Sequence, residues 1–209
     1  MKTKFQLAQA FLFALAAASA FSSSLNDLVN RSKGRDVAET TLQSDELFAR
    51  RDVSGQGGIF EFINNEVDKA QGLVNFDKGR LAQNEAFIFD AISISFGEAD
   101  AGDVTAGAVD YTADMIAALK NAEFEIKQSG RKVISLPVAS LYNPYVGSSE
   151  KDNWTELGNL HYLVDNEDFT WNIKFPSNLS VPQFTGSTGS KKSFLQVRLR
   201  GYRTSKRSI

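Results

Sequence analysis

The run from Ala86 to Phe96 constrains the fold of this chain more than any other stretch, because its apolar residues recur with a period of two. Successive side chains of a β-strand point to opposite faces, whereas those of a helix repeat about every 3.6 residues. The run therefore predicts a long strand in which Ile88, Ile92, Ile94 and Phe96 share one core-facing side.

Shorter runs of the same kind occur from residue 57 onwards, separated by clusters of Gly, Pro, Asn, Asp and Ser. The dipeptide Ser129-Gly130 and the segment Asp165–Asp168 have the composition of hairpin turns, which predicts a largely antiparallel arrangement. We expect further strands at Ile59–Ile63, Glu123–Lys127, Arg131–Leu136, Asn159–Val164, Phe169–Phe175 and Phe194–Tyr202.

One segment of this region has helical spacing instead. Asp110–Asn121 places Met115, Ile116 and Leu119 on one face of a helix. A single helix among many strands does not give the alternating units of a parallel α/β fold. Residues 57–209 are therefore predicted to be all-β, with two packed antiparallel sheets.

The composition supports a packed core but no reactive centre. A chain of 209 residues can bury such a core without disulfides, and 16 Phe residues make Phe its main material. Cysteine is absent and His161 is the sole histidine, which excludes thiolate metal sites, Cys nucleophiles and His-pair metal motifs. We interpret His161 as a strand residue. No other spacing matches a catalytic, cofactor or metal motif, so we expect no enzyme and no cofactor.

The first 21 residues begin with the basic segment Met1–Lys4 and continue as an apolar stretch that ends in Ala18-Ser19-Ala20. This layout is that of a secretory signal peptide, which would be cleaved. The same composition suits a retained helix, although the stretch is short of the roughly 20 apolar residues that cross a bilayer. Both interpretations stay open. A retained helix would need a membrane or a neighbouring subunit against its large apolar residues, which are Phe5, Leu7, Phe11, Leu12, Phe13 and Leu15.

Residues 22–56 mix polar residues with isolated apolar ones and end in a glycine-rich stretch, which predicts an arm or linker. Within it, Ser44–Arg51 has the pattern of a short helix, because Ser44 suits the N-cap and the two arginines suit the last turn. The chain is thus divided into a hydrophobic helix or signal-like segment (1–21), an arm (22–56) and a β-sandwich domain (57–209).

Charge is distributed unevenly, although the net charge is only −2. No acid follows Asp168, whereas basic residues continue to the end of the sequence. In the last predicted strand Arg198 and Arg200 share one face and Val197 and Leu199 the other. This basic ridge is either a charge contact with acidic protein or phosphate, or the protection of an edge strand against unwanted pairing. Its residues and those of the basic tail are Arg198, Arg200, Arg203, Lys206 and Arg207.

Three segments resemble the jelly-roll capsid proteins of tailless, membrane-containing bacteriophages. They are Phe76–Glu85 with the strand that follows, the Pro-bounded segment Asn172–Pro182, and the closing Val197–Tyr202 with its basic tail. The resemblance covers about residues 57–205, rests on pattern and transfers no active-site residue. It implies a single antiparallel jelly-roll β-sandwich preceded by a hydrophobic helix and an arm.

The resemblance also implies a function, that of a structural virion protein that self-assembles into a shell. Copies of the chain itself would be its partners, a lipid membrane and other virion proteins are further candidates, and contact with nucleic acid stays open. The alternative is a secreted or cell-envelope β-sandwich for binding or adhesion. In that case Tyr142, Tyr145, Trp154 and Trp171 would stack on sugar or a surface polymer, and core packing is the competing explanation for these aromatic residues.

Overall fold

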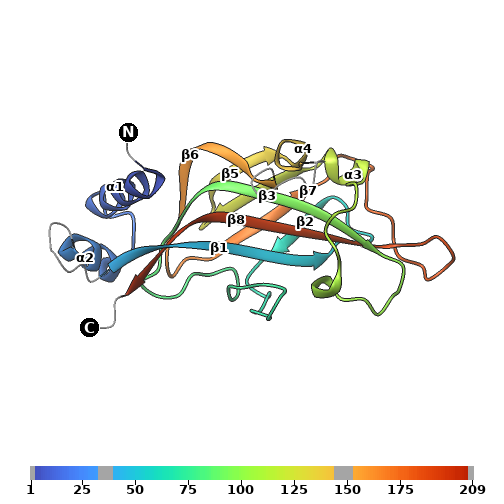
Figure 1. The fold of residues 1–209 in the computed structure, drawn as a ribbon, viewed down its shortest axis with the longest axis horizontal. Coiled ribbons are helices and arrows are strands. Elements are labelled where there is room, and N and C mark those ends of the chain that lie inside the picture. The colour runs from blue at the N-terminus through green and yellow to red at the C-terminus, as the bar shows by residue number, and fades with distance from the viewer. Residues whose placement is uncertain (1–2, 33–39, 144–152, 207–209) are drawn as a thin grey trace.

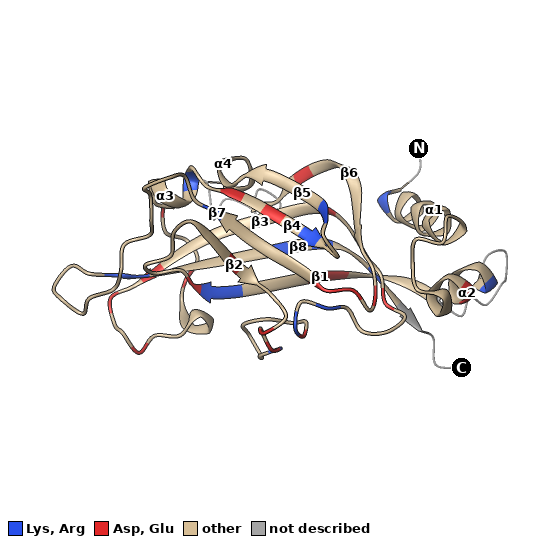
Figure 2. Ribbon diagram, turned by 180° about the vertical axis from the view of Figure 1, so that it is seen from behind, with Lys and Arg blue, Asp and Glu red and all other residues tan. Residues whose placement is uncertain are grey.

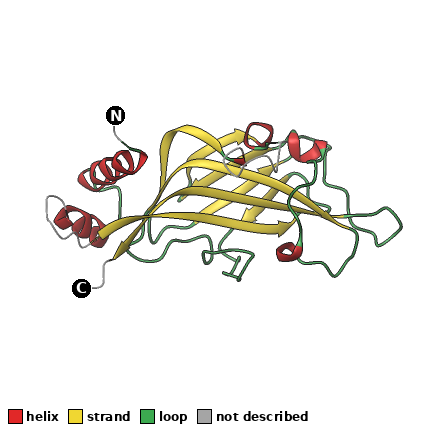
Figure 3. Cartoon of the chain, viewed as in Figure 1, coloured by secondary structure: helices red, strands yellow, loops and turns green. Residues whose placement is uncertain are grey.

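The computed structural model describes residues 3–32, 40–143 and 153–206. In this part of the chain eight strands form two antiparallel sheets of four strands, which pack face to face as a sandwich (Figures 1 and 3). The predicted two-sheet, mostly β architecture is therefore confirmed.

Sheet 1 has the strand order β1-β8-β3-β6, and sheet 2 has the order β2-β7-β4-β5. Every strand predicted from the sequence is present. The strands are β1 (Thr40–Asp52), β2 (Ile59–Ile63), β3 (Phe87–Ala99), β4 (Glu123–Gln128), β5 (Arg131–Pro137), β6 (Thr155–Leu163), β7 (Phe169–Lys174) and β8 (Lys192–Lys206). The helices are α1 (Lys4–Ala17), α2 (Ser23–Ser32), the 3₁₀ helix η1 (Ala106–Ala108), α3 (Ala117–Lys120) and α4 (Val138–Leu141).

The strand pairs are nested in the sequence. The first strand pairs with the last, from Thr40 opposite Lys206 to Asp52 opposite Phe194. Likewise β2 pairs with β7, β3 with β6, and β4 with β5, all antiparallel. The pairs β3–β8 and β4–β7 then join these four ladders into two sheets.

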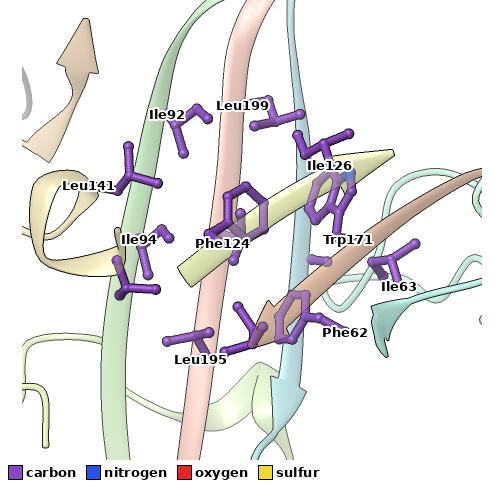
Figure 4. Packing of buried hydrophobic residues seen from close by; sticks show 14 of the residues in the cluster. Phe62, Ile63, Ile92, Ile94, Phe124, Ile126, Leu141, Trp171, Leu195 and Leu199 are labelled. Atoms are coloured by element: carbon purple, nitrogen blue, oxygen red, sulfur yellow. The ribbon is translucent and has the colours of Figure 1, made fainter. Parts of the chain in front are cut away.

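The core lies between the sheets and is filled mainly by aromatic and β-branched residues (Figure 4). Phe62, Phe124 and Trp171 of sheet 2 are fully buried there, facing Ile92 and Ile94 of sheet 1. The alternation of strand side chains places Ile92 and Ile94 inside, as the sequence predicts. The core assignment of Ile92 and Ile94 is thus confirmed.

The predicted position of Ile88 is wrong. A β-bulge between Phe89 and Ala91 shifts the register of β3, so that Phe89 lies in the core before the bulge and Ile92 after it. Ile88 therefore points to the outer face of sheet 1, where it packs in a second apolar cluster. The bulge lies opposite Gly201, where an added Cβ would collide with the backbone of Ile88.

The predicted helix Ser44–Arg51 and the predicted arm around it are also wrong. These residues lie in β1, which pairs with β8 over its whole length and buries Leu47 and Ala49 in the core. Thirteen residues of ladder pairing outweigh the local helical preference of Glu, Leu, Ala and Arg. The sandwich consequently begins before the predicted boundary at residue 57.

Two turn predictions have different outcomes. Ser129-Gly130 joins the paired strands β4 and β5, with both residues at positive φ, as a tight hairpin requires. Asp165–Asp168 is a turn but not a hairpin, because β6 belongs to sheet 1 and β7 to sheet 2. It crosses from one sheet to the other.

The helix predicted at Asp110–Asn121 is reduced to the single turn Ala117–Lys120. Tyr111 packs against Phe194 on the outer face of sheet 1, whereas Met115 is buried in the core between the sheets. The chain must pass from the outer face of sheet 1 into the core between Tyr111 and Met115. Four residues of helix are too short for this, so the segment is extended.

Candidate contact surface

The apolar set on α1 and the ridge residues Arg198 and Arg200 lie on the outer face of sheet 1. The helices α1 and α2 cover one end of this face (Figure 1), and we call them the helix pair. A capping box begins α1, because Gln6 N donates to Thr3 Oγ1 at 3.2 Å and Thr3 N donates to Gln6 Oε1 at 3.0 Å. Beyond Lys4 the helix carries no charge.

The six apolar residues predicted to make contacts are not equivalent in the structure. Leu12 is buried within the chain, and Phe11, Phe13 and Leu15 are partly buried against the same cluster. Phe5 is 41% exposed and Leu7 is 47% exposed. They are the only large apolar residues of α1 that are exposed and could contact a neighbour.

The helix pair rests on an apolar group that we call the outer cluster. Ala8, Leu12 and Ala16 of α1 pack there with Leu25 and Val29 of α2. The strands contribute residues from the outward side of sheet 1. The buried members from the rest of the chain are Phe21, Leu42, Ala86, Ile88 and Val164.

The start of α2 is fixed by a buried carboxylate. Asp165 is 2% exposed and accepts hydrogen bonds from Ser22 Oγ at 2.6 Å and from Asn84 N at 2.8 Å. A neighbouring bond joins Ser24 Oγ to Asn84 Oδ1 at 2.6 Å. Asp165 was predicted only as a turn residue, and its role here depends on a helix far away in the sequence.

The start of α1 is held by ion pairs between side chains instead. Lys4 Nζ lies 3.0 Å from Asp90 Oδ2 and 2.5 Å from Glu156 Oε2, and the hydrogen bond to Glu156, with Asp90 close by, raises the pKa of Lys4. Glu156 Oε1 also lies 2.8 Å from Arg200 Nη2. Asp90 is the residue that interrupts the apolar alternation of β3, a signal that could have indicated both the bulge and a charged partner.

The basic ridge is present, and its partners lie in the same chain. The guanidinium carbons of Arg198 and Arg200 lie 4.6 and 4.8 Å from the ring centre of Trp154. Arg198 is 4.0 Å from Glu46 of β1. The arginines therefore form a charged, aromatic-lined ladder across sheet 1, and Figure 2 shows charged residues of both signs along its strands.

Strand alternation places Arg203 of the basic tail on the opposite face of β8 from Arg198 and Arg200, and its partners also lie in the same chain. Arg203 lies 2.6 Å from Asp45 and 3.5 Å from Glu85. The side chain of Lys206 and the whole of Arg207 lie outside the described residues.

The edge-strand explanation of the ridge is wrong, because β8 lies between β1 and β3 in sheet 1 and is not an edge strand.

An open cleft of about 580 Å³ lies between the ladder and the start of α1. Its charged residues are paired within the chain: Lys4 with Asp90, Glu46 with Arg198 and Asp45 with Arg203. A second cleft, of about 630 Å³, is lined by Lys69, Lys78, Arg80 and Arg203 together with acids such as Asp168, which pairs with Arg80. Neither cleft presents charge of one sign.

The outer face of sheet 2 carries a separate charged cluster around Glu125 of β4. The Glu125 side chain is 1% exposed and lies 2.7 Å from Lys174, 3.0 Å from Lys127 and 3.6 Å from Lys132. Burial alone raises the pKa of Glu125, but hydrogen bonds from Lys174 and Lys127 outweigh it and lower the pKa from 4.5 to about 2. The cluster ties β4, β5 and β7 together.

The aromatic residues of the adhesion hypothesis lie mostly in packed positions. Trp171 is fully buried, and Trp154 and Tyr142 are each 9% exposed. Tyr145 lies outside the described residues. His161 is a half-buried residue of β6, where burial lowers its pKa.

Two further classes of site can be assessed for residues 3–32, 40–143 and 153–206. In these ranges no group of three or more His, Asp or Glu side chains is placed to hold a metal ion. No helix among them combines the length and hydropathy needed to cross a membrane.

Sequence comparisons add no relative. No protein-family model and no curated protein matches this chain.

Proposed function

We propose that the sandwich is a jelly roll and that the chain is a structural virion protein, a capsid subunit that self-assembles into a shell. The observation that carries the proposal is the nested pairing of β1 with β8, β2 with β7, β3 with β6 and β4 with β5. A jelly roll is an eight-stranded double sheet of two Greek keys, and viral capsid proteins are among its main users.

Other uses of this architecture have less support here. Lectins are also jelly rolls, but Trp154, Tyr142 and Trp171 are packed in this chain rather than displayed for stacking on sugar. The described clefts carry balanced charge, which does not favour an anionic ligand. A role that depends on shape and self-association needs no such site.

Self-association has a specific candidate surface on α1. Phe5 and Leu7 are exposed large apolar residues on a helix that carries no charge beyond Lys4. A neighbouring subunit, or a lipid layer beneath the shell, would cover them and remove apolar area from water. Leu7 is thus the residue at which a charge should interfere most directly with assembly.

Assembly of the purified full-length chain tests the proposal. We expect regular higher-order species whose fraction rises with protein concentration, measured by sedimentation velocity and negative-stain electron microscopy. Leu7→Asp should shift assembly to at least about tenfold higher concentration, since it places a charge in an apolar contact. Gln83→Asp, at an exposed loop position before β3, is the matched control. A chain that stays monomeric at every concentration, with and without lipid vesicles, would contradict the shell function.

A further inference from the structure

The two ends of the helix pair are attached to the sandwich by different kinds of interaction. At the start of α2, Ser22 bonds to the buried Asp165, and Phe21, Leu25 and Val29 are each at most 6% exposed. These contacts are neutral or shielded from solvent. Salt should therefore affect them little.

The start of α1 is attached through exposed charges. The side chain of Lys4 is 57% exposed and that of Glu156 is 52% exposed, so water and salt reach both partners. The Asp90 side chain is 16% exposed, and Glu156 divides its two oxygens between Lys4 and Arg200. Exposed ion pairs contribute little stability and are screened by salt.

The apolar contacts of α1 are also modest. Its fully covered side chains are those of Ala8, Leu12 and Ala16, two of which are single methyl groups. Phe5 and Phe11 make edge-to-face ring contacts with Tyr202 and Tyr162, at centroid distances of 5.8 and 5.9 Å. α1 therefore covers the sheet with small residues and partly exposed rings.

The segment between the helices is a tight turn at which the direction of the chain can change. Ser19 has φ 54°, and Ser19 N and Ala20 N donate to Ala16 O and Leu15 O. Immediately after it come the buried Phe21 and the Asp165 anchor. A rotation of α1 about residues 18–20 would break its packing on Leu25 and Val29, while the Asp165 anchor would still hold the start of α2.

We propose that α1 is a latch: it is closed on the outer face of sheet 1 by the Lys4–Asp90–Glu156 ion contacts and opens about residues 18–20 while α2 and the sandwich stay folded. Opening separates Ala8, Leu12 and Ala16 from the rest of the outer cluster, including Leu25 and Val29 of α2, and frees the apolar side of α1 itself. The latch is a property of the single chain, so it does not depend on what the chain assembles into.

The absence of cysteine makes the latch directly measurable. A single Ala8→Cys substitution places a thiol under α1, and Ala49→Cys places one in the core between the sheets, both at positions with 0% exposure. In dilute, unassembled full-length protein, the rate of thiol labelling then reports how often each site opens. We expect Ala8→Cys to be labelled at least about tenfold faster than Ala49→Cys, because local opening precedes global unfolding.

The ionic part of the latch predicts how this rate changes. Raising the ionic strength from about 0.01 M to 1 M shortens the Debye length from about 30 Å to 3 Å, and should accelerate labelling of Ala8→Cys but not of Ala49→Cys. Adding Lys4→Gln to Ala8→Cys should accelerate thiol labelling about two- to fivefold and reduce the effect of salt. Adding Lys4→Arg should leave the labelling rate and its salt dependence unchanged. Lys191→Gln, which removes a comparable exposed ion pair with Glu98, is the matched control.

Hydrogen exchange of the α1 amides in the unsubstituted chain provides an independent measurement, since Ala8→Cys could itself loosen the helix. Exchange in α1 that is faster than in β3 and β8, and faster still at high salt, supports the latch. Equal labelling rates of Ala8→Cys and Ala49→Cys under all conditions would overturn the latch. A labelling rate of Ala8→Cys that changes neither with salt nor with Lys4→Gln would also overturn it.

Discussion

The two apolar clusters that meet at sheet 1 are built in different ways. The core between the sheets contains whole aromatic side chains such as Phe124 and Trp171, each with 0% exposure. In the outer cluster on the opposite face, the buried residues that α1 contributes are only Ala8, Leu12 and Ala16, with exposed charged side chains at the margin. Strand β3 contributes to both, because the bulge after Phe89 changes which residues face inward.

This difference indicates two levels of stability in one chain. A close-packed core loses much free energy when a single side chain is truncated, because the cavity collapses only partly. A helix resting on methyl groups and exposed ion pairs can separate at lower cost. Perturbations of the core should therefore unfold the molecule, whereas perturbations of the outer cluster should mainly release α1.

The largest effect is expected in the core. Ile92→Ala should lower the free energy of unfolding by about 2–5 kcal/mol, since Ile92 is fully buried between the sheets. Leu7→Ala, at an exposed position of α1, should change it by at most about 0.5 kcal/mol. Denaturant midpoints measured on both variants test the contrast. Equal midpoints would mean that the core is not the main source of stability.

The next prediction concerns the β-bulge of β3, which lies between the two clusters and opposite Gly201. At Gly201 an added Cβ would collide with the carbonyl oxygen of Ile88 and lie 2.7 Å from the Cα of Phe89, so backbone must move. Gly201→Ala should cost about 3 kcal/mol, the upper end of the usual range for overpacking. Gly107→Ala meets its nearest atom at 3.4 Å and is the control. Thermal unfolding that is unchanged in Gly201→Ala would show that the bulge is not held by this close approach.

The buried charged cluster on sheet 2 should differ from the exposed contacts of Lys4 in its response to acid. The pKa of Glu125 is lowered from 4.5 to about 2 in the folded chain, so its contribution is complete above about pH 4.5 and is lost as the pH falls towards 2. Glu125→Gln should lower the free energy of unfolding by about 1.5–3 kcal/mol at pH 7, as expected for hydrogen bonds to a charged group.

The pH dependence of this effect is the decisive measurement. The difference between the parent and Glu125→Gln should shrink between about pH 4.5 and 2, because the carboxylate of the unfolded chain is protonated below about pH 4.5 whereas that of the folded chain keeps its charge until about pH 2. Glu66→Gln, at an exposed loop position, is the control. A difference that is constant with pH would assign the loss to packing instead of charge.

The strands were predictable because their residues alternate locally, and this alternation also identified Ile92 and Ile94 as core residues. Strand β1 was missed because Ser44–Arg51 has good helix formers, and only pairing with the last strand decides its conformation. The bulge that places Ile88 outside is marked in the sequence only by Asp90, which interrupts the apolar alternation, and its register depends on contacts with β8 and β6.

The candidate contact surface was predictable in composition but not in arrangement. The apolar character of α1 and the shared face of Arg198 and Arg200 follow from the sequence. Their partners do not, since Asp90, Glu156 and Trp154 come from other strands or the segments that lead into them. Asp165 has turn chemistry by sequence, and its contact with Ser22 spans more than half of the chain.

The smallest effect is expected at the arginine ladder, and it decides between a contact within the chain and one with a neighbour. Arg198→Gln and Arg200→Gln each remove a cation above Trp154 and a partly exposed ion pair, so each should cost about 0.5–1 kcal/mol of unfolding free energy. Because the described acidic partners belong to the same chain, we expect the double variant to associate with the parent's affinity and salt dependence in sedimentation velocity. Lys191→Gln again controls for the loss of a surface charge. Weakened association that no longer responds to salt, with stability unchanged, would instead assign the ladder to the surface of a neighbouring subunit.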